Sequence, residues 1–392
     1  MRCMWASAVF AAAGSLMLCA NGGELRREGR YWVAQREGTT PARGVLTVLV
    51  TARGSVSIRG GPVGTIAWTA TARVRAGDER QARALLAAAG VEQRREAQGL
   101  SLSFPGIVSQ PDADVAIVVP GDLRLCRVRT KGGSVQASDL SGALEVSSDG
   151  GRLQMDGIRG PVTARTGGGE IRVGSVEGDA RCFTGAGAIR AERIGGRAQL
   201  ETAGGEIFVQ YVHGPLSASS AGGNIEIARA DAAITARTSG GVIEVGQAVG
   251  PVMADTAGGA IQISGSSGTQ CQASEGAIRL KNVAGAVRAI SGSGDIVAQL
   301  MAGRRLENSK LSTNSGDITV VIPASSILTV VAQSMRSGAA GRIISDFPEI
   351  RVAGRSGPGG NLEMAEGLLN GGGPVLQVVA SGGSVYLRRQ QR

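Results

Sequence analysis

A glycine that recurs every eighteen residues constrains the fold of this chain more than any other feature of its sequence. The spacing holds over eight copies and continues with small shifts at Gly276, Gly294 and Gly316, while a second glycine series occupies most of the midpoints. The eight registered positions are Gly133, Gly151, Gly169, Gly187, Gly205, Gly223, Gly241 and Gly259. A fixed period of this length is typical of repeat architectures, in which each repeat is one structural unit.

Aliphatic residues follow each glycine at the second and fourth positions, with mostly polar residues between them. This alternation predicts a short strand that buries one face. The second-position column contains Ile171, Ile189, Ile207, Ile225, Ile243 and Ile261. The midpoint series predicts a second strand of the same kind, so each unit holds two strands that bury the same face. We therefore predict an all-β fold, a single-stranded parallel β-solenoid (β-helix or β-roll) with 18-residue coils.

A hydroxyl residue stands three positions before the glycine in successive repeats. Its inward parity predicts a ladder at a corner of the solenoid, with each oxygen bound to backbone groups of the turn. The threonines of this ladder are Thr166, Thr184, Thr202, Thr238 and Thr256.

Composition excludes several other classes. The 392 residues include 62 glycines and 42% hydrophobic residues, but only 3% aromatic residues. Glycine does not recur at every third position, which excludes collagen, and the apolar content argues against disorder. The net charge of +9 lies mainly at the two ends and is carried almost wholly by arginine. We interpret it as a solvated surface, with anionic envelope polymers or lipid head groups as alternative partners. No nucleic-acid partner is expected, because an aromatic stacking platform is absent.

The first twenty residues predict an export signal. Arg2 supplies the positive end, and an apolar run from Met4 to Leu18 follows it. The run is short for a membrane span, and no later segment predicts a transmembrane helix in the mature chain. The protein is therefore expected to be periplasmic, cell-surface or secreted, with a lipid anchor at Cys19 as the alternative to cleavage after Ala20.

The chain divides into four predicted segments. Residues 1–20 are the signal peptide, and residues 21–122 form an N-terminal β-rich cap with a short helix over 78–89. Residues 123–322 are the solenoid, and residues 323–392 form a C-terminal cap that ends in a strand at 384–389.

Three cysteines remain after the signal segment, at Cys126, Cys182 and Cys271. All three fall on inward columns, several coils apart and beyond disulfide reach. We expect them to be small buried hydrophobic residues.

The outer faces offer only weak candidates for a site. Glu206, Glu226 and Glu244 follow the glycine on successive coils, and Phe208, Tyr211 and His213 lie close together in one coil. Glycosidic cleavage needs a carboxylate pair, but eighteen-residue coils lack the loops that wall a groove. The favoured interpretation of the glutamates is solvated charge, with a weak cation or partner contact as the alternative. For the aromatic and histidine trio, cover of a corner is favoured, with a small surface patch that contacts a ligand as the alternative.

No catalytic, cofactor or metal site is predicted. The recurring aspartate of calcium-binding nonapeptide repeats is absent, and a single histidine leaves little room for triad or metal-cluster chemistry.

Two runs carry a family resemblance: GGEIRVGSVEGDARCFTGAG and GGEIFVQYVHGPLSASSAGG. They resemble the bacterial DUF4097 β-strand-repeat family, whose members are often labelled adhesins. VAIVVPGDLRL before the repeats, SGDITVVIPAS after them and the closing GGSVYLRR extend the similarity to about residues 45–389. The resemblance implies an exported or envelope-associated β-solenoid and supplies no catalytic residues.

Together these observations predict a non-enzymatic exported solenoid that presents a surface to cell-envelope polymers or envelope proteins. The alternatives are a carbohydrate-active β-helix and a regulatory or sensing module of an envelope-stress system. The identity of the partner and the oligomeric state stay open at this level.

Overall fold

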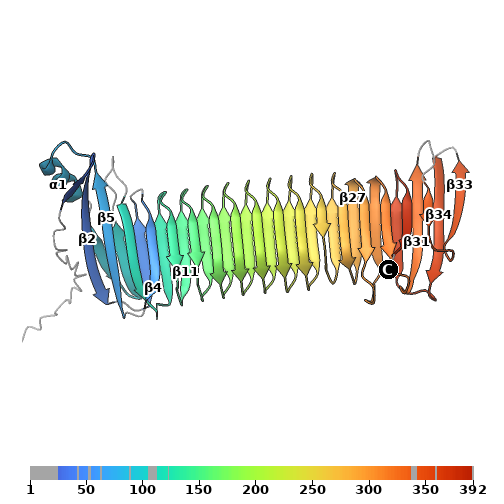
Figure 1. The fold of residues 1–392 in the computed structure, drawn as a ribbon, viewed down its shortest axis with the longest axis horizontal. Coiled ribbons are helices and arrows are strands. Elements are labelled where there is room, and N and C mark those ends of the chain that lie inside the picture. Colours follow the sequence, from blue (N-terminus) through green and yellow to red (C-terminus); the bar gives the residue numbers. More distant parts are fainter. Residues whose placement is uncertain are drawn as a thin grey trace, which may run out of the picture.

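The structure of the protein is a computed structural model. It describes residues 25–390, apart from 42–43, 52–53, 62–63, 88–89, 105–112, 122, 337–341 and 358–359. Two long sheets face each other along a straight rod (Figure 1), and each sheet contains eighteen strands within the described residues. The predicted parallel β-solenoid is confirmed. The predicted signal segment lies outside the described residues.

The first sheet, here called sheet A, contains the strands that follow the first glycine series. Its strands, in spatial order along the rod, are β1 (Arg26–Glu28), β2 (Tyr31–Pro41), β5 (Thr65–Val74), β8 (Ala113–Pro120), β4 (Val56–Gly61), β10 (Val135–Ser138), β12 (Leu153–Asp156), β14 (Ile171–Val176), β16 (Ile189–Ile194), β18 (Ile207–Val212), β20 (Ile225–Ala230), β22 (Ile243–Ala248), β24 (Ile261–Ile263), β26 (Ile278–Val283), β28 (Ile296–Leu300), β30 (Ile318–Ile322), β36 (Val385–Arg389) and β32 (Ile343–Ser345).

The second sheet, sheet B, contains the strands of the midpoint series. In spatial order they are β6 (Glu92–Glu96), β7 (Gly99–Phe104), β3 (Val45–Val50), β9 (Leu125–Thr130), β11 (Ala143–Ser148), β13 (Val162–Thr166), β15 (Ala180–Thr184), β17 (Ala198–Thr202), β19 (Leu216–Ser220), β21 (Ile234–Thr238), β23 (Val252–Thr256), β25 (Thr269–Ala273), β27 (Val287–Ser293), β29 (Ser309–Ser315), β35 (Val375–Ala380), β31 (Leu328–Arg336), β34 (Gly360–Leu369) and β33 (Arg351–Gly357).

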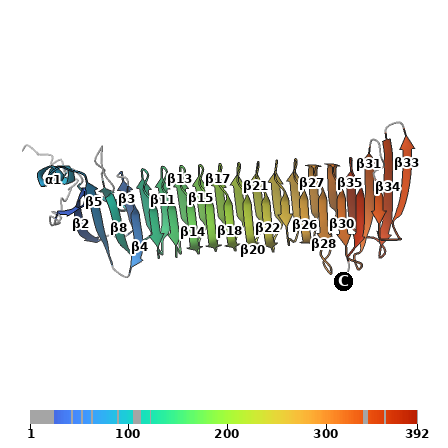
Figure 2. The ribbon, with the colours of Figure 1, turned by 45° about the horizontal axis from the view of Figure 1, so that its top comes forward.

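Each central coil places one strand in each sheet, and equivalent residues of neighbouring coils lie in register. Ile171 is paired with Ile189 in sheet A, and Val162 is paired with Ala180 in sheet B, both in parallel strands. The coils therefore stack without turning back on themselves, and the arrows of one sheet run alike along the rod (Figure 2). One longer loop, residues 301–308 between β28 and β29, accounts for the wider spacing from Gly294 to Gly316.

A narrow core fills the space between the sheets. The large side chains of sheet A face two inward columns of sheet B that include many small residues, such as Ala180 and Ala198 in one column and Ala236 in the other, all fully buried. The predicted ladder residues Ile171, Ile189, Ile207, Ile225, Ile243 and Ile261 are all buried, at 0–1% exposure. Pairing large with small residues keeps the two sheets close and leaves little empty space.

The parallel stack continues on both sides of residues 123–322, but the coils there are out of chain order. The coil β3–β4 lies between β7–β8 and β9–β10, although both neighbours come later in the sequence. At the other end, the last coil, β35–β36, inserts between β29–β30 and β31–β32. Near each end of the rod, one coil is thus inserted between two others and paired on both sides.

Antiparallel strands and one helix complete the ends. At the N-terminal end β2 pairs with β1 and β5, and β6 pairs with β7, whereas at the C-terminal end β34 pairs with β31 and β33. The edge strands β1 and β6 carry mostly charged residues, which disfavour pairing with another chain. Helix α1 (Glu79–Ala87) begins after Asp78, whose side chain accepts a hydrogen bond from the backbone of Gln81.

The hydroxyl ladder joins each coil to the one before it. Thr202 donates to the carbonyl oxygen of Gly187 (2.9 Å) and accepts from the backbone nitrogen of Gly205 (3.1 Å). Thr166, Thr184, Thr238 and Thr256 make the same pair of contacts. These hydroxyls are buried and form hydrogen bonds with backbone groups at the corner, so their role is structural.

The glycine column lies at the closest backbone approach between coils. A Cβ atom added to Gly223 would stand 2.0 Å from the carbonyl oxygen of Gly205, whereas one added to Gly222 would meet no atom within 4 Å. The registered glycine is therefore required by contact with the preceding coil, and its neighbour is not.

The cysteines are buried, free and far from one another in the stack. Cys126, Cys182 and Cys271 form no disulfide. Burial raises the pKa of the Cys126 and Cys182 thiols to about 12. They behave as small apolar side chains of the core.

The glycine contact predicts an asymmetric pair of variants. Gly223→Ala should lower stability by about 1–3 kcal/mol, because the added methyl group forces the coils apart. Gly222→Ala, the matched control, should leave stability nearly unchanged. Urea denaturation followed by circular dichroism measures both, and equal midpoints for the two variants would contradict the contact.

The hydroxyl ladder predicts a second loss. Thr202→Val keeps the shape of the side chain but leaves a backbone N–H and a carbonyl without this partner, at a cost of about 1–3 kcal/mol. Thr235→Val, on the outer side of β21, two strands away in the same sheet, serves as the control and should change little. Thermal melts of the two proteins test the difference; a Thr202→Val melt at the wild-type temperature would be the unfavourable result.

Candidate functional site

The predicted glutamates do not all meet. Glu226 and Glu244 are register partners on β20 and β22, and both are exposed. Glu206 precedes Ile207 and lies in the next column along the strand direction, where the adjacent coil has Asn224. The structure therefore brings two of the three carboxylates onto adjacent strands of a flat face, with no wall beside them.

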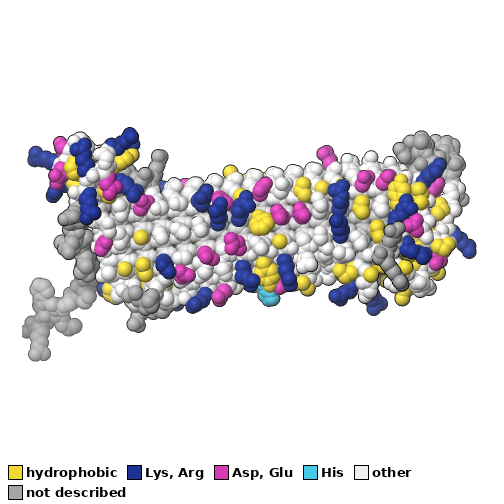
Figure 3. Space-filling view, in the orientation of Figure 1, with side chains coloured by type: hydrophobic (Ala, Val, Ile, Leu, Met, Phe, Trp, Pro, Cys, Tyr) yellow, Lys and Arg dark blue, Asp and Glu magenta, His cyan; other side chains and the backbone are white. Residues whose placement is uncertain are grey.

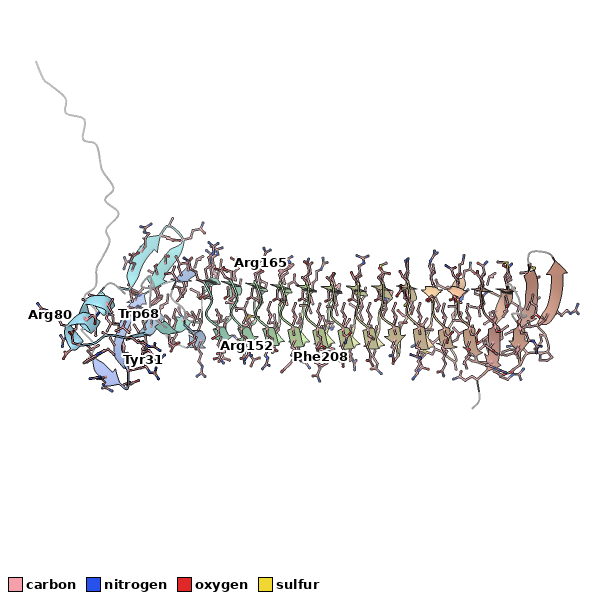
Figure 4. The ribbon with its side chains drawn as sticks, turned by 90° about the horizontal axis from the view of Figure 1, so that it is seen from above. Tyr31, Trp68, Arg80, Arg152, Arg165 and Phe208 are labelled. Carbon is pink, nitrogen blue, oxygen red and sulfur yellow. The ribbon has the colours of Figure 1, made fainter. Side chains whose placement is uncertain are left out.

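Phe208 lies in the same column as these two glutamates. Its register neighbours are Arg190 on one side and Glu226 on the other, and the ring is half-buried on the outer face of sheet A. On one face of the rod, Figure 3 shows dark-blue side chains, then a yellow group, then magenta side chains in sequence along the axis. Figure 4 places Phe208 and Arg152 on this side and Arg165 on the opposite side.

The structure joins Tyr211 and His213 to a residue that the sequence analysis missed, Asp231. The Tyr211 hydroxyl donates to Asp231 Oδ2 (2.5 Å), and His213 Nδ1 lies 3.2 Å from the same oxygen. Arg229 Nε is 3.4 Å from Asp231 Oδ1, and the Arg193 guanidinium stacks over the Tyr211 ring at 5.0 Å. Asp231 follows His213 by one period of eighteen, so the column rule already contained the signal.

Hydrogen bonding explains the electrostatics of this cluster. The bond to Asp231 raises the pKa of Tyr211, and the bonds from Tyr211 and His213 lower the pKa of Asp231. No hydroxyl or thiol nucleophile other than the tyrosine contacts the histidine among the described residues. The cluster is an exposed hydrogen-bonded corner, and its Arg229 also lines an open hollow of about 400 Å³ together with Gln247 and Arg304.

A second group that sequence reasoning missed surrounds Glu170. Its carboxylate lies 2.9 Å from Arg172 Nε and 3.4 Å from the Nε atoms of Arg152 and Arg190. The hydrogen bond from Arg172 and the charges of the other two arginines hold the pKa of Glu170 below its usual value. One carboxylate serves three guanidinium groups, so the group keeps a net positive charge.

A shallow groove follows the corner at which the strands of sheet B end; we call it the corner trough. It comprises two overlapping hollows of about 770 and 430 Å³ that share Ser219, Ser220 and Ser239. Its lining also includes Ser147, Asp149, Arg165, Gly167, Phe183, Gly185, Glu201, Ala203, Ala221, Arg237, Asp255, Ala257, Gln272 and Ser274. The trough spans the coils of β11 to β25.

The repeat register explains why this corner is hollow. The residue after each ladder hydroxyl is mostly small, as at Gly167, Ala203 and Ala221, while the residue before it is often larger. The larger side chains form one wall, in which Arg165 stacks on the Phe183 ring at 4.9 Å. The result is a long, open channel with a mixed polar and apolar lining.

The described residues contain neither a candidate metal cluster nor a candidate membrane-spanning helix. No group of three histidine, cysteine, aspartate or glutamate side chains there is placed to hold a metal ion. No helix in the described part of the chain has the length and apolar character needed to cross a membrane.

These features define an elongated parallel β-solenoid with polar, flat outer faces. Residues 210–340 match the family model described as Toastrack DUF4097, so the resemblance stated from the sequence is confirmed over this segment.

Two solved structures are similar at low identity. A "putative cell adhesion protein" from Clostridium sporogenes shares 9% identity, with 91% of this chain and 100% of that chain covered and a TM-score of 0.19. A "putative adhesin" from Bacteroides fragilis shares 11% identity, with 91% and 97% covered and a TM-score of 0.20. Comparison with curated proteins finds no match.

The hydrogen bond to Asp231 predicts a change in tyrosine ionisation. Asp231→Asn removes the carboxylate that opposes the phenolate, so Tyr211 should ionise at lower pH than in the wild type. The ultraviolet absorbance of tyrosinate during an alkaline titration measures the shift. Asp255→Asn, which removes a carboxylate paired with Arg237, is the control, and superimposable curves for Asp231→Asn and the wild type would refute the contact.

Proposed function

We propose that the protein is a non-enzymatic, exported rod that binds an extended polymer of the cell envelope along the corner trough. The observation that carries the proposal is the shape of the trough, which is continuous over eight coils, about 34 Å at strand spacing. Enclosed apolar pockets suit small molecules, whereas a long open channel suits a thin chain that lies along it.

The chemistry of the lining favours a glycan as this polymer. Ser219 and Ser239 are exposed, so their hydroxyls can form hydrogen bonds with a ligand. The ladder hydroxyls beside them, Ser220 and Thr238, already donate to backbone carbonyl oxygens. Charges of both signs, from Arg165 to Asp255, lie along the wall. Hydroxyl-rich chains form many weak polar contacts of this kind, which sum along a repeating surface.

The arrangement of the carboxylates supports binding rather than cleavage. Glu226 and Glu244 lie in the column of Phe208 on sheet A. Figure 4 shows Phe208 on the opposite side of the rod from Arg165 of the trough, so a chain held in the trough does not reach the two glutamates. Glycoside hydrolysis requires a carboxylate pair that flanks the scissile bond. Export rests on residues 1–20, whose composition is that of a signal peptide.

A trough-blocking variant tests the proposal. Ser219→Trp should fill the channel and reduce co-sedimentation of the purified protein with isolated envelope polysaccharide at least about fivefold, because several adjacent contacts are lost. Ser217→Trp, two residues away on the same strand and outside the lining, is the matched control and should bind as the wild type does.

Two outcomes of the same co-sedimentation assay would contradict the proposal. Equal binding by wild type and Ser219→Trp would place the ligand elsewhere. Release of reducing sugar ends from the polysaccharide would show an enzyme and would overturn the non-enzymatic role.

A further inference from the structure

Seven outward residues of sheet A form a column with a particular order of charge. Each residue is the register partner of the next, through strands β12 to β24. The column, here called the charge column, consists of Gln154, Arg172, Arg190, Phe208, Glu226, Glu244 and Gln262. Its two ends are alike, its two halves carry opposite charge, and Phe208 stands at the centre.

The charges of the column are available to a partner. Arg172 and Arg190 share the single carboxylate of Glu170 with Arg152, so this half stays positive. Glu226 and Glu244 have no ion-pair partner within the part of the chain that the structure describes, and both are exposed. The sequence of dark-blue, yellow and magenta side chains on the face in Figure 3 follows this order.

We infer that this face binds a second copy of the chain, in an antiparallel dimer with a two-fold axis through Phe208. Rotation about that axis places Arg172 against Glu244 of the second copy and Arg190 against its Glu226. Phe208 meets its own counterpart, and Gln154 meets Gln262. An isologous interface requires this self-complementarity, in which a residue and its partner exchange roles.

Because the coils are evenly spaced, the opposed residues of the two copies stay aligned along the rod. Opposed residues lie the same number of coils from Phe208, and all coils have one spacing of about 4.8 Å. Ion pairs formed at one coil are therefore in step with those at the next. The flat and straight sheet in Figures 2 and 4 allows both rods to keep this registration over several coils.

The neighbouring columns contain one like-charge contact in this arrangement. The two-fold axis of a face-to-face antiparallel dimer lies in the interface along the strand direction, so each residue meets the same strand position of the coil equally far on the other side of Phe208. In the columns two residues to either side, Ala188 therefore faces Asn224, and Glu192 faces Ala228. Glu206 meets its own counterpart at the axis, and this repulsion is set against the four ion pairs of the charge column.

The area is that of a reversible dimer. Seven coils of about 4.8 Å and a strand width of about 17 Å give on the order of 570 Å² per copy and 1,100 Å² in total. That is the lower end for specific interfaces. We expect association in the micromolar range that weakens with salt, because the ion pairs lie at a solvent-accessible surface.

A second copy fits the observations better than an unrelated partner does. Binding to a different protein requires only that the partner complement this face. It does not require the two halves of the face to carry opposite charges at equal distances from Phe208. The corner trough lies on the opposite side of the rod from Phe208, so a dimer leaves it open (Figure 4). The inference is thus independent of the polymer ligand.

Charge reversal tests the dimer by sedimentation velocity of the purified protein in low salt. In a dimer of the Glu226→Arg/Glu244→Arg variant, all four ion pairs of the charge column become pairs of like charge, which should weaken association at least about tenfold. Adding Arg172→Glu/Arg190→Glu to the same chain restores opposite pairs and should restore the dimer. The control Glu201→Arg/Asp255→Arg makes the same change in net charge on sheet B and should dimerise as the wild type does.

Two results would overturn the inference: a wild-type protein that stays monomeric at about 100 μM, well above the expected dissociation constant, or a dimer that Glu226→Arg/Glu244→Arg leaves intact. If the four-residue variant loses its β-sheet circular dichroism, Phe208→Glu replaces it, because this change opposes two carboxylates at the axis and should also yield monomer. Ser219→Trp should remain dimeric, which separates this test from that of the trough.

Discussion

The close approach of glycine backbones between successive coils is the contact on which the rest of the rod depends. The carbonyl oxygen of Gly205 occupies the space where a Cβ of Gly223 would lie, and the hydroxyl of Ser220 donates to the same oxygen. These two conditions fix where one coil sits on the last. Once they are met, each strand pairs in register, the isoleucine column closes over the small residues of sheet B, and outward columns line up along the axis.

Most of the solenoid could be predicted from the sequence because its information is local and repeated. Glycine, hydroxyl and isoleucine recur at fixed offsets, so one coil defines the next. The ends could not be predicted in the same way. Pairing of β3 with both β7 and β9, and of β35 with both β29 and β31, joins segments far apart in the chain, and no period marks them. Caps are decided by long-range pairing rather than by pattern.

The candidate sites show the same division. Phe208, Glu226 and Glu244 were recognised as outward residues, but the meaning of their order needed the register that places Arg172 and Arg190 in line with them. Asp231 was overlooked although it stands one period after His213, where the column rule would have found it. The hollow corner required coordinates, because it arises from side chains that are absent rather than present. The surface of such a solenoid is described better by its columns of register partners than by single residues.

The intercalated terminal coils have a consequence for how such a rod changes in evolution. Because the out-of-order pairings are confined to the coils near the two ends of the rod, whole eighteen-residue units in the middle are the parts that can be gained or lost without disturbing either set of pairings. The span of the molecule then varies in steps of about 4.8 Å, one strand spacing at a time. A lineage could adjust the distance between whatever its two ends touch by duplication alone, while every remaining coil keeps its neighbours.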